Sequence, residues 1–129
     1  MYSQKIFLSY SSKDSSWATD FISILEDEGL DVFSAVRDIK HGDQWQQKIE
    51  NALRESAVVI FILSENSIDS AWTYFEFGAA IAGDKKIVPI YIDDVEHPKL
   101  FDKYSSLKET SPVDAGKKVA EMLLQTEDV

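Results

Sequence analysis

The sequence predicts an α/β fold built on a central parallel sheet, with helices on both faces. Three observations support this prediction. Short apolar runs typical of buried strands recur along the chain, at 5–10, 30–33, 57–63 and 86–92. The segments between these runs carry apolar residues at helical spacing. Glycines and small polar residues separate the two kinds of segment, so strands and helices alternate as in βαβ units with right-handed crossovers.

Four stretches have apolar residues at the spacing that places them on one face of a helix. They cover 17–29, 45–53, 70–83 and 113–125. In the third helix, the hydroxyl of Ser70 is expected to cap the N-terminus. Gly83 is expected to end the helix in the left-handed conformation that glycine tolerates.

Other segments carry weaker signals. The stretch 34–44 is expected to be a loop, and Trp45 is expected to lie in the core as the first residue of a helical stripe. Pro89 indicates that the fourth strand is an edge strand or contains a bulge. The pattern is too weak over 93–110 to predict an element, and 126–129 is expected to be a frayed tail or a linker.

Composition excludes several classes of chemistry. At 129 residues the chain is expected to form one domain, 1–129, that needs no disulfide or metal to bury a core. The absence of cysteine excludes thiolate nucleophiles and Cys-based zinc sites. His41 and His97 are far apart and lack ligand partners at motif spacing, so we expect neither a metal site nor a Ser-His-Asp triad.

The net charge of −10 disfavours binding to nucleic acid, which depends on neutralising phosphates with Lys and Arg, and to anionic lipid. A local cleft could still be positive and bind a small anion. The N-terminus lacks the pattern of a signal peptide, and no apolar stretch approaches the roughly 18–20 residues that span a bilayer. A cytoplasmic protein without a membrane partner is expected.

Ligands of parallel α/β sheets bind beyond the carboxyl ends of the strands. This rule predicts that Ser9, Tyr10, the stretch 34–44 and the stretch 70–76 lie on the same rim of the sheet. In 70–76, Trp72 and Glu76 are four residues apart and share one helix face, with Thr73 beside them. The pair is a candidate site for a sugar or a nucleotide; the alternative is one core aromatic residue and one solvated charge.

Three common α/β functions lack their motifs. No glycine-rich turn ending in Lys-Ser or Lys-Thr follows a strand, so a P-loop is excluded. The first strand is followed by Ser11-Ser12-Lys13 instead of the glycines of a dinucleotide-binding turn. A phospho-receiver domain needs an aspartate after the third strand and a lysine after a late strand, where this chain has Ser64 and Tyr91-Ile92.

One carboxylate is too few for ordinary glycoside hydrolysis, because an acid must protonate the leaving oxygen. It suffices when the leaving group is already cationic, as nicotinamide is on the ribose of NAD+. A fixed carboxylate at Glu76 would stabilise the oxocarbenium-like transition state more than the ground state. Trp72 would position the sugar or an aromatic ring by packing against it.

The chain resembles the Toll/interleukin-1 receptor (TIR) domains in their bacterial form. The resemblance covers nearly all of the sequence up to Ile92 and is carried by four segments in order. They are IFLSYSSKD, VFSAVRDIKHGDQWQQKIENAL, VVIFILSENSIDSAWTYFEFGAA and KIVPIYI. It implies a flavodoxin-like three-layer sandwich with about five strands, and cleavage of NAD+ to nicotinamide and linear or cyclic ADP-ribose.

The resemblance also implies residue roles. Glu76, in a Trp-x-x-x-Glu arrangement with Trp72, is implied to be catalytic. The implied substrate contacts are Trp72, Ser9, Tyr10, Ser11 and Asp38. The implied assembly loop, which completes the site of a neighbouring subunit, is Ile39, Lys40, His41, Gly42 and Asp43. NAD+ enters as the substrate, so no cofactor is expected.

Two departures from the family pattern concern the site. Thr73 stands where many relatives have a cysteine. Ser11 and Ser12 stand where some relatives have arginines, which leaves Lys13 as the available cation for phosphate.

Self-association, a sensor domain or effector protein as partner, and a role in defence against phage are further expectations from the family. The chain is then either excised from a longer protein or activated by a separate molecule. The alternative function is a TIR adaptor that assembles signalling complexes without chemistry.

Overall fold

The computed structural model describes residues 4–40 and 42–127. It contains one parallel sheet with the strand order β2-β1-β3-β4-β5. The strands are β1 (Lys5–Ser9), β2 (Asp31–Ser34), β3 (Ser56–Leu63), β4 (Lys86–Tyr91) and β5 (Leu107–Lys108). The helices are η1 (Ser12–Asp14), α1 (Ser15–Asp27), α2 (Ala35–Asp38), α3 (Trp45–Glu55), α4 (Ala71–Ala82), η2 (Lys99–Phe101) and α5 (Pro112–Glu127). The predicted flavodoxin-like α/β fold, with about five parallel strands, is confirmed.

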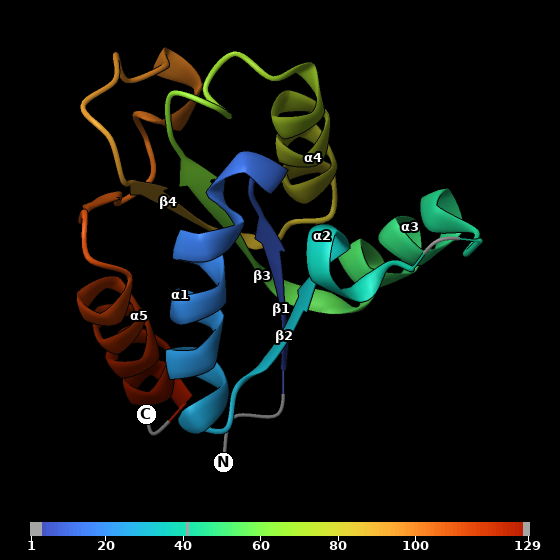
Figure 1. The fold of residues 1–129 in the computed structure, drawn as a ribbon, viewed down its shortest axis with the longest axis horizontal. Helices are drawn as coiled ribbons and strands as arrows, with labels where there is room; N and C mark the ends of the chain where they lie inside the picture. Colours follow the sequence, from blue (N-terminus) through green and yellow to red (C-terminus); the bar gives the residue numbers. More distant parts are fainter. Residues whose placement is uncertain (1–3, 41, 128–129) are drawn as a thin grey trace.

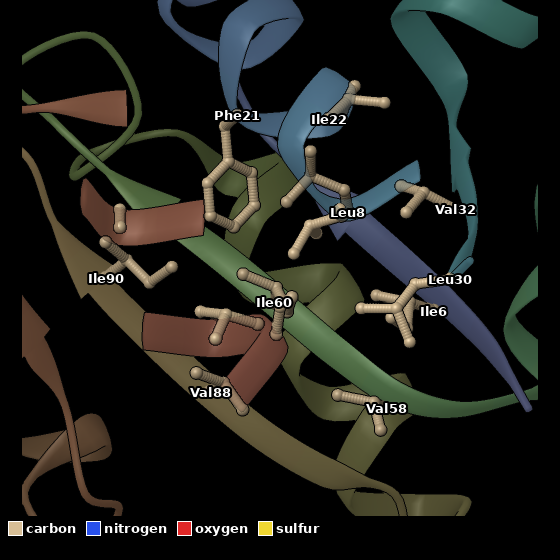
Figure 2. Packing of buried hydrophobic residues seen from close by; sticks show 14 of the residues in the cluster. Ile6, Leu8, Phe21, Ile22, Leu30, Val32, Val58, Ile60, Val88 and Ile90 are labelled. Carbon is tan, nitrogen blue, oxygen red and sulfur yellow. The ribbon is translucent and has the colours of Figure 1, made fainter. Parts of the chain in front are cut away.

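The core lies on both faces of the sheet, which gives the molecule three layers. Successive side chains of a strand point to opposite faces, so alternate residues of β1 and β3 enter different clusters. Ile6, Leu8 and Ile60 pack against α1 and α5, which lie side by side (Figure 1; close view in Figure 2). Phe7 and Phe61 point the other way, into the cluster that contains residues of α3 and α4.

The sheet interior explains why the strands were predictable. The burial pattern of β3 runs almost without interruption, as expected for a central strand covered on both sides. Pro89 pairs with Phe61 of β3, and β5 pairs only with Ile90 and Tyr91 of β4. β4 lies between β3 and β5, so the prediction that it is an edge strand is wrong. The short β5 does not reach Pro89, so the proline needs no backbone donor on that side.

Some predictions were wrong. The stretch 34–44 is not a loop throughout, because Ala35–Asp38 form the single turn α2, which Ser34 caps by accepting a hydrogen bond from the Arg37 amide at 3.1 Å. Trp45 begins α3 as predicted but is 52% exposed rather than in the core. Residues 126–127 are not a tail, since they belong to the last turn of α5, while 128–129 lie outside the described residues.

Candidate functional site

Helix α4 delivers Glu76 to the interior of the molecule. Thr73, Glu76, Phe77 and Ala80 are the buried residues of this helix, and their spacing of three and four residues forms one stripe facing the sheet. Glu76 is therefore on the buried face, with only 2% of its surface exposed. The alternative of a solvated charge beside a core tryptophan is wrong, because Trp72 is the exposed member of the pair, at 39%.

The ends of α4 differ in detail from the prediction. Ser70 occupies the N-cap position, but its side chain makes no capping hydrogen bond. Gly83 follows the last helical residue, but its φ of −86° is not left-handed. The left-handed residue is Asp84, with φ of 56°. Asp and Asn tolerate this region better than most residues, so the left-handed residue lies one position after the predicted Gly83, although the helix ends where it was expected.

Ser9 is the hydrogen-bond partner of Glu76. It ends β1 two residues after Phe7, so its side chain points to the same face of the sheet, toward α4. Its hydroxyl donates a buried hydrogen bond of 2.5 Å to Oε1 of Glu76. Sixty-seven positions separate the two residues in sequence, so the fold creates this pair.

Burial controls the protonation of Glu76. Removal from water disfavours the charged carboxylate and raises the pKa of Glu76 to about 7. The Ser9 hydroxyl and the Trp72 indole oppose this effect, because they stabilise the carboxylate, but they do not cancel it. Glu76 is therefore divided between its acid and carboxylate forms near neutral pH, which is unusual for a glutamate and common for catalytic carboxylates.

A pocket of about 270 Å³ opens above Glu76 at the carboxyl edge of the sheet. Ser9, Tyr10, Ser11, Trp72 and Glu76 all line it, so five of the six residues predicted for catalysis and substrate binding meet in one place. The stretch 34–44 contributes Ala35 and Val36. The predicted convergence of three distant segments on one rim is confirmed.

Sequence reasoning missed part of the wall, which comes from the polar turn after β3. Asn66 and Ser67 line the pocket. The side-chain amide of Asn66 donates to Oδ1 of Asp14 at 2.9 Å, and the Ser64 hydroxyl donates to Oδ2 of the same carboxylate at 2.6 Å. These bonds hold the turn after β3 against the turn after β1. The cluster of small polar residues at 64–70 indicates such a turn, but only the fold shows what it contacts.

Asp38 does not line the described pocket. Its Oδ2 accepts a hydrogen bond from the Ser34 amide at 2.9 Å, and its Oδ1 forms an ion pair with Arg37 at 2.8 Å. Arg37 also donates to Glu26 and to the carbonyl of Val32. The anionic side chains of Asp38 and Glu26 stabilise the charged guanidinium and therefore raise the pKa of Arg37. In this geometry Asp38 secures the N-terminus of α2, and its contact with a substrate stays a prediction.

The predicted assembly loop follows α2. Asp43 accepts hydrogen bonds from the Lys40 amide at 2.7 Å and from the Lys48 ammonium at 3.0 Å, and these two interactions lower its pKa. Gly42 has a φ of +93°, which side-chain-bearing residues rarely adopt. His41 lies outside the described residues. The loop's role in assembly stays a prediction.

Three further observations concern the rest of the molecule. A larger groove, of about 540 Å³, lies beyond Tyr74 between the turn after β3 and the segment 95–99. Among the described residues that line it, no ionisable side chain is fully buried, so it lacks the environment of Glu76.

The described part of the chain contains no group of three or more metal-ligating side chains. Within the same residues, every helix is too short or too polar to cross a bilayer.

Comparisons with known proteins agree with the fold. A family model described as TIR domain matches residues 6–123. Toll-like receptor 6 of Homo sapiens is 28% identical over 108 residues, covering 79% of this chain and 14% of the receptor. A protein of Acinetobacter baumannii named 2' cyclic ADP-D-ribose synthase AbTIR is 32% identical over 94 residues, covering 67% of this chain and 34% of that protein.

A crystal structure of a TIR domain, from the Toll-related receptor TRR-2 of Hydra magnipapillata, superposes with a TM-score of 0.77. The superposition covers 97% of this chain and 98% of that one at 18% sequence identity, so it bears on the fold. This chain spans well under half the length of the two sequence relatives. On the family match, which covers most of the sequence, this chain belongs to the TIR domain family.

Proposed function

We propose that this chain cleaves the bond between nicotinamide and ribose in NAD+, and that Glu76 is the catalytic residue. The observation that carries the proposal is the buried Glu76 carboxyl, held by Ser9 beneath a pocket lined by hydroxyl groups and by Trp72. The name of the Acinetobacter relative, a cyclic ADP-ribose synthase, supports the same class of reaction.

In the proposed reaction the C1′–N1 bond breaks and its electron pair stays with nicotinamide, which leaves as a neutral ring. Water supplies an oxygen to C1′ and releases a proton, giving ADP-ribose; attack by a hydroxyl of the same molecule gives a cyclic product instead. The Glu76 carboxylate faces the positive charge that develops on the ribose and accepts hydrogen bonds from its hydroxyls. No general acid is needed for the leaving group.

The surroundings of Glu76 suit this role. In the carboxylate form, Oε1 keeps the Ser9 hydrogen bond, and the remaining lone pairs are available to the ribose. The low dielectric of the buried site strengthens the attraction between the carboxylate and the oxocarbenium carbon. The Trp72 ring, which lines the pocket, offers a face for the nicotinamide or the sugar.

The experiment is incubation of the protein at high concentration with NAD+, with nicotinamide release measured by chromatography and products identified by mass spectrometry. Wild type should release nicotinamide and Glu76→Ala should not. Glu65→Ala is the matched control, because Glu65 is an exposed glutamate on the preceding turn, outside the pocket. Equal release by wild type and Glu76→Ala would remove Glu76 as the catalyst.

A second function, assembly of signalling complexes through TIR–TIR contacts, is favoured by a row of exposed aromatic rings. Trp72 stacks on Phe75 with ring centroids 5.0 Å apart, and Trp45 meets Trp72 edge-on at 5.9 Å. Trp45 and Phe75 are 52% and 56% exposed, which is typical of a contact surface. The two functions are compatible, and self-association, including a role for 39–43, would make NAD+ cleavage depend on protein concentration. Assembly without any Glu76-dependent turnover would leave the scaffold function alone.

A further inference from the structure

The pocket around Glu76 has an unusual charge for a dinucleotide site. Among the described residues that line it there is no lysine, arginine or histidine. The wall consists of hydroxyl-bearing, amide, aromatic and aliphatic side chains around the one carboxyl group. A pyrophosphate placed at this wall would meet hydrogen-bond donors but no positive side chain to neutralise it.

The groups next to the wall make the environment more negative. Asp14 lies behind Asn66, which donates to its Oδ1 at 2.9 Å while lining the pocket. Two cations on α2 and α3 are already engaged in ion pairs: Arg37 pairs with Asp38 and Glu26, and Lys48 pairs with Asp43. Lys13 follows the pocket-lining Ser11 and Ser12, and its side chain is exposed on η1. The whole chain carries a net charge of −10.

The size of the pocket leads to the same conclusion. Its volume of about 270 Å³ lies below the range of roughly 300–1,000 Å³ that is usual for pockets enclosing drug-sized ligands. NAD+ contains two nucleosides joined by a pyrophosphate. On this volume the pocket can enclose one of the two nucleosides, so we expect the reacting half of the substrate to supply most of the binding.

We propose that this pocket accepts N-ribosylpyridinium nucleosides without phosphates, and that it cleaves nicotinamide riboside at least as efficiently as NAD+. The inference rests on the proposed function of Glu76. The C1′–N1 bond breaks, nicotinamide leaves with the electron pair, and the oxygen of water joins C1′ as a proton is released. Nicotinamide riboside and water thus give nicotinamide, ribose and a proton. The substrate is a cation, so the acidic surroundings favour its approach.

The test compares kcat/KM for nicotinamide riboside, nicotinamide mononucleotide and NAD+ in one buffer, with nicotinamide release as the readout. At low salt, the riboside should equal or exceed NAD+, and the mononucleotide should fall about tenfold or more below the riboside, because its phosphate charges approach Glu76 in low dielectric. Added salt should narrow that gap. Glu76→Gln should abolish turnover of all three.

A charge variant separates electrostatics from shape. Ser12 is exposed and lines the pocket, so Ser12→Arg places a cation at its mouth. This variant should raise kcat/KM for the mononucleotide and NAD+ by about tenfold and lower that for the riboside, because the riboside is a cation. An equal rise for the riboside would contradict the electrostatic part of the inference.

The outcomes distinguish the inference from the proposed function. Glu76-dependent cleavage of NAD+ with a lower kcat/KM for the riboside would overturn the inference and keep the function. Cleavage of the riboside but not of NAD+ would keep the inference about the riboside and overturn the proposed cleavage of NAD+. Failure with all three substrates would overturn both.

Discussion

Two carboxylates at the carboxyl edge of the sheet, Glu76 and Asp38, have opposite environments. Asp38 lies in α2, is partly exposed, and accepts hydrogen bonds from a backbone amide and from Arg37. Glu76 lies in α4, is buried, and has no charged partner, since its stabilising donors are the neutral Ser9 hydroxyl and Trp72 indole. The first carboxylate is neutralised by the protein itself. The second has a raised pKa and lone pairs that point to a pocket, so a cationic substrate can stabilise its charged form.

The comparison shows what makes a carboxylate available for chemistry. Partners supplied by the fold make a carboxylate structural, because they consume its lone pairs and stabilise its charge. A buried carboxylate with too few partners is destabilised in its charged form, because it has lost its hydration. The positive charge that develops on a substrate stabilises that charged form. On this basis we expect the two residues to respond oppositely to substitution, in activity and in stability.

The largest expected effect is on activity. Glu76→Gln should lower kcat/KM for nicotinamide release by about 1,000-fold, because the neutral amide no longer stabilises the oxocarbenium-like transition state. Asp38→Asn, the matched change at the other carboxylate, should stay within about threefold of wild type, because Asp38 acts through the backbone of α2. Similar losses in both variants would show that Asp38 also contacts the substrate, and the comparison would fail.

The next effect is on stability, where Glu76→Gln should be beneficial. The folded pKa of about 7 lies above the ordinary value of 4.5, so the folded state binds the extra proton between these pH values. The free energy of unfolding of wild type therefore falls as pH rises from about 4.5 to 7, by about 3 kcal/mol in total. Glu76→Gln has no carboxyl group to ionise, so its unfolding free energy should not fall with pH in this way. At pH 8 the variant should therefore exceed wild type in unfolding free energy by about 3 kcal/mol.

Urea unfolding of both proteins at pH 4.5 and pH 8 measures this difference. The difference in unfolding free energy between Glu76→Gln and wild type should be close to zero at pH 4.5 and about 3 kcal/mol at pH 8. A gap that is independent of pH would mean that Glu76 titrates normally.

Asp38→Ala should have the opposite sign. It removes the acceptor for the Ser34 amide and one partner of Arg37, so the free energy of unfolding should fall by about 1–2 kcal/mol. Val36→Ala is the control, because this exposed neighbour lies in the same turn and should change stability little. Unchanged stability in Asp38→Ala would leave the carboxylate free for another role.

The smallest effect concerns the pH dependence of Ser9→Ala. Ser9 donates to the carboxylate form and lowers the pKa of Glu76, so its removal should raise that pKa further. The acid side of the pH–activity profile should move upward by about one pH unit. Ser9→Thr keeps the hydroxyl and should restore the wild-type profile. Ser70→Ala, another pocket serine, makes no capping bond and should leave the profile in place.

Most of the fold was predictable because β1 to β4 are short apolar runs and α1, α3, α4 and α5 carry apolar stripes. The two-residue strand β5 and the single turn α2 carry neither signal and were not predicted. Glu76 and Trp72 were also found from sequence. Their burial was not, because which face of α4 meets the sheet depends on Phe77 and Ala80 packing against β3, not on the spacing of the pair. The partner of Glu76 was equally hidden, since Ser9 reaches it only when β1 and α4 are assembled.

Two further differences have the same origin. Trp45 fits a helical stripe, but α3 buries Ile49, Ala52 and Leu53 and leaves Trp45 beside Trp72. The periodicity of apolar residues shows which residues share a face of a helix, but it does not show how far the sheet extends beneath that face. Asp38 lies in a segment that reaches the rim, yet Ser34 and Arg37 already satisfy its carboxylate.

The most direct test of the account is to measure the pKa of Glu76 and the pH dependence of kcat/KM for NAD+ on the same protein. The carboxyl carbon of Glu76 can be followed by ¹³C NMR, while nicotinamide release is measured from pH 5 to 9. Because kcat/KM reports the ionisation of the free enzyme, both curves should have their midpoint at about 7, with activity rising as the carboxylate forms. A Glu76 that titrates near 4.5, or activity that stays constant across this range, would contradict the account.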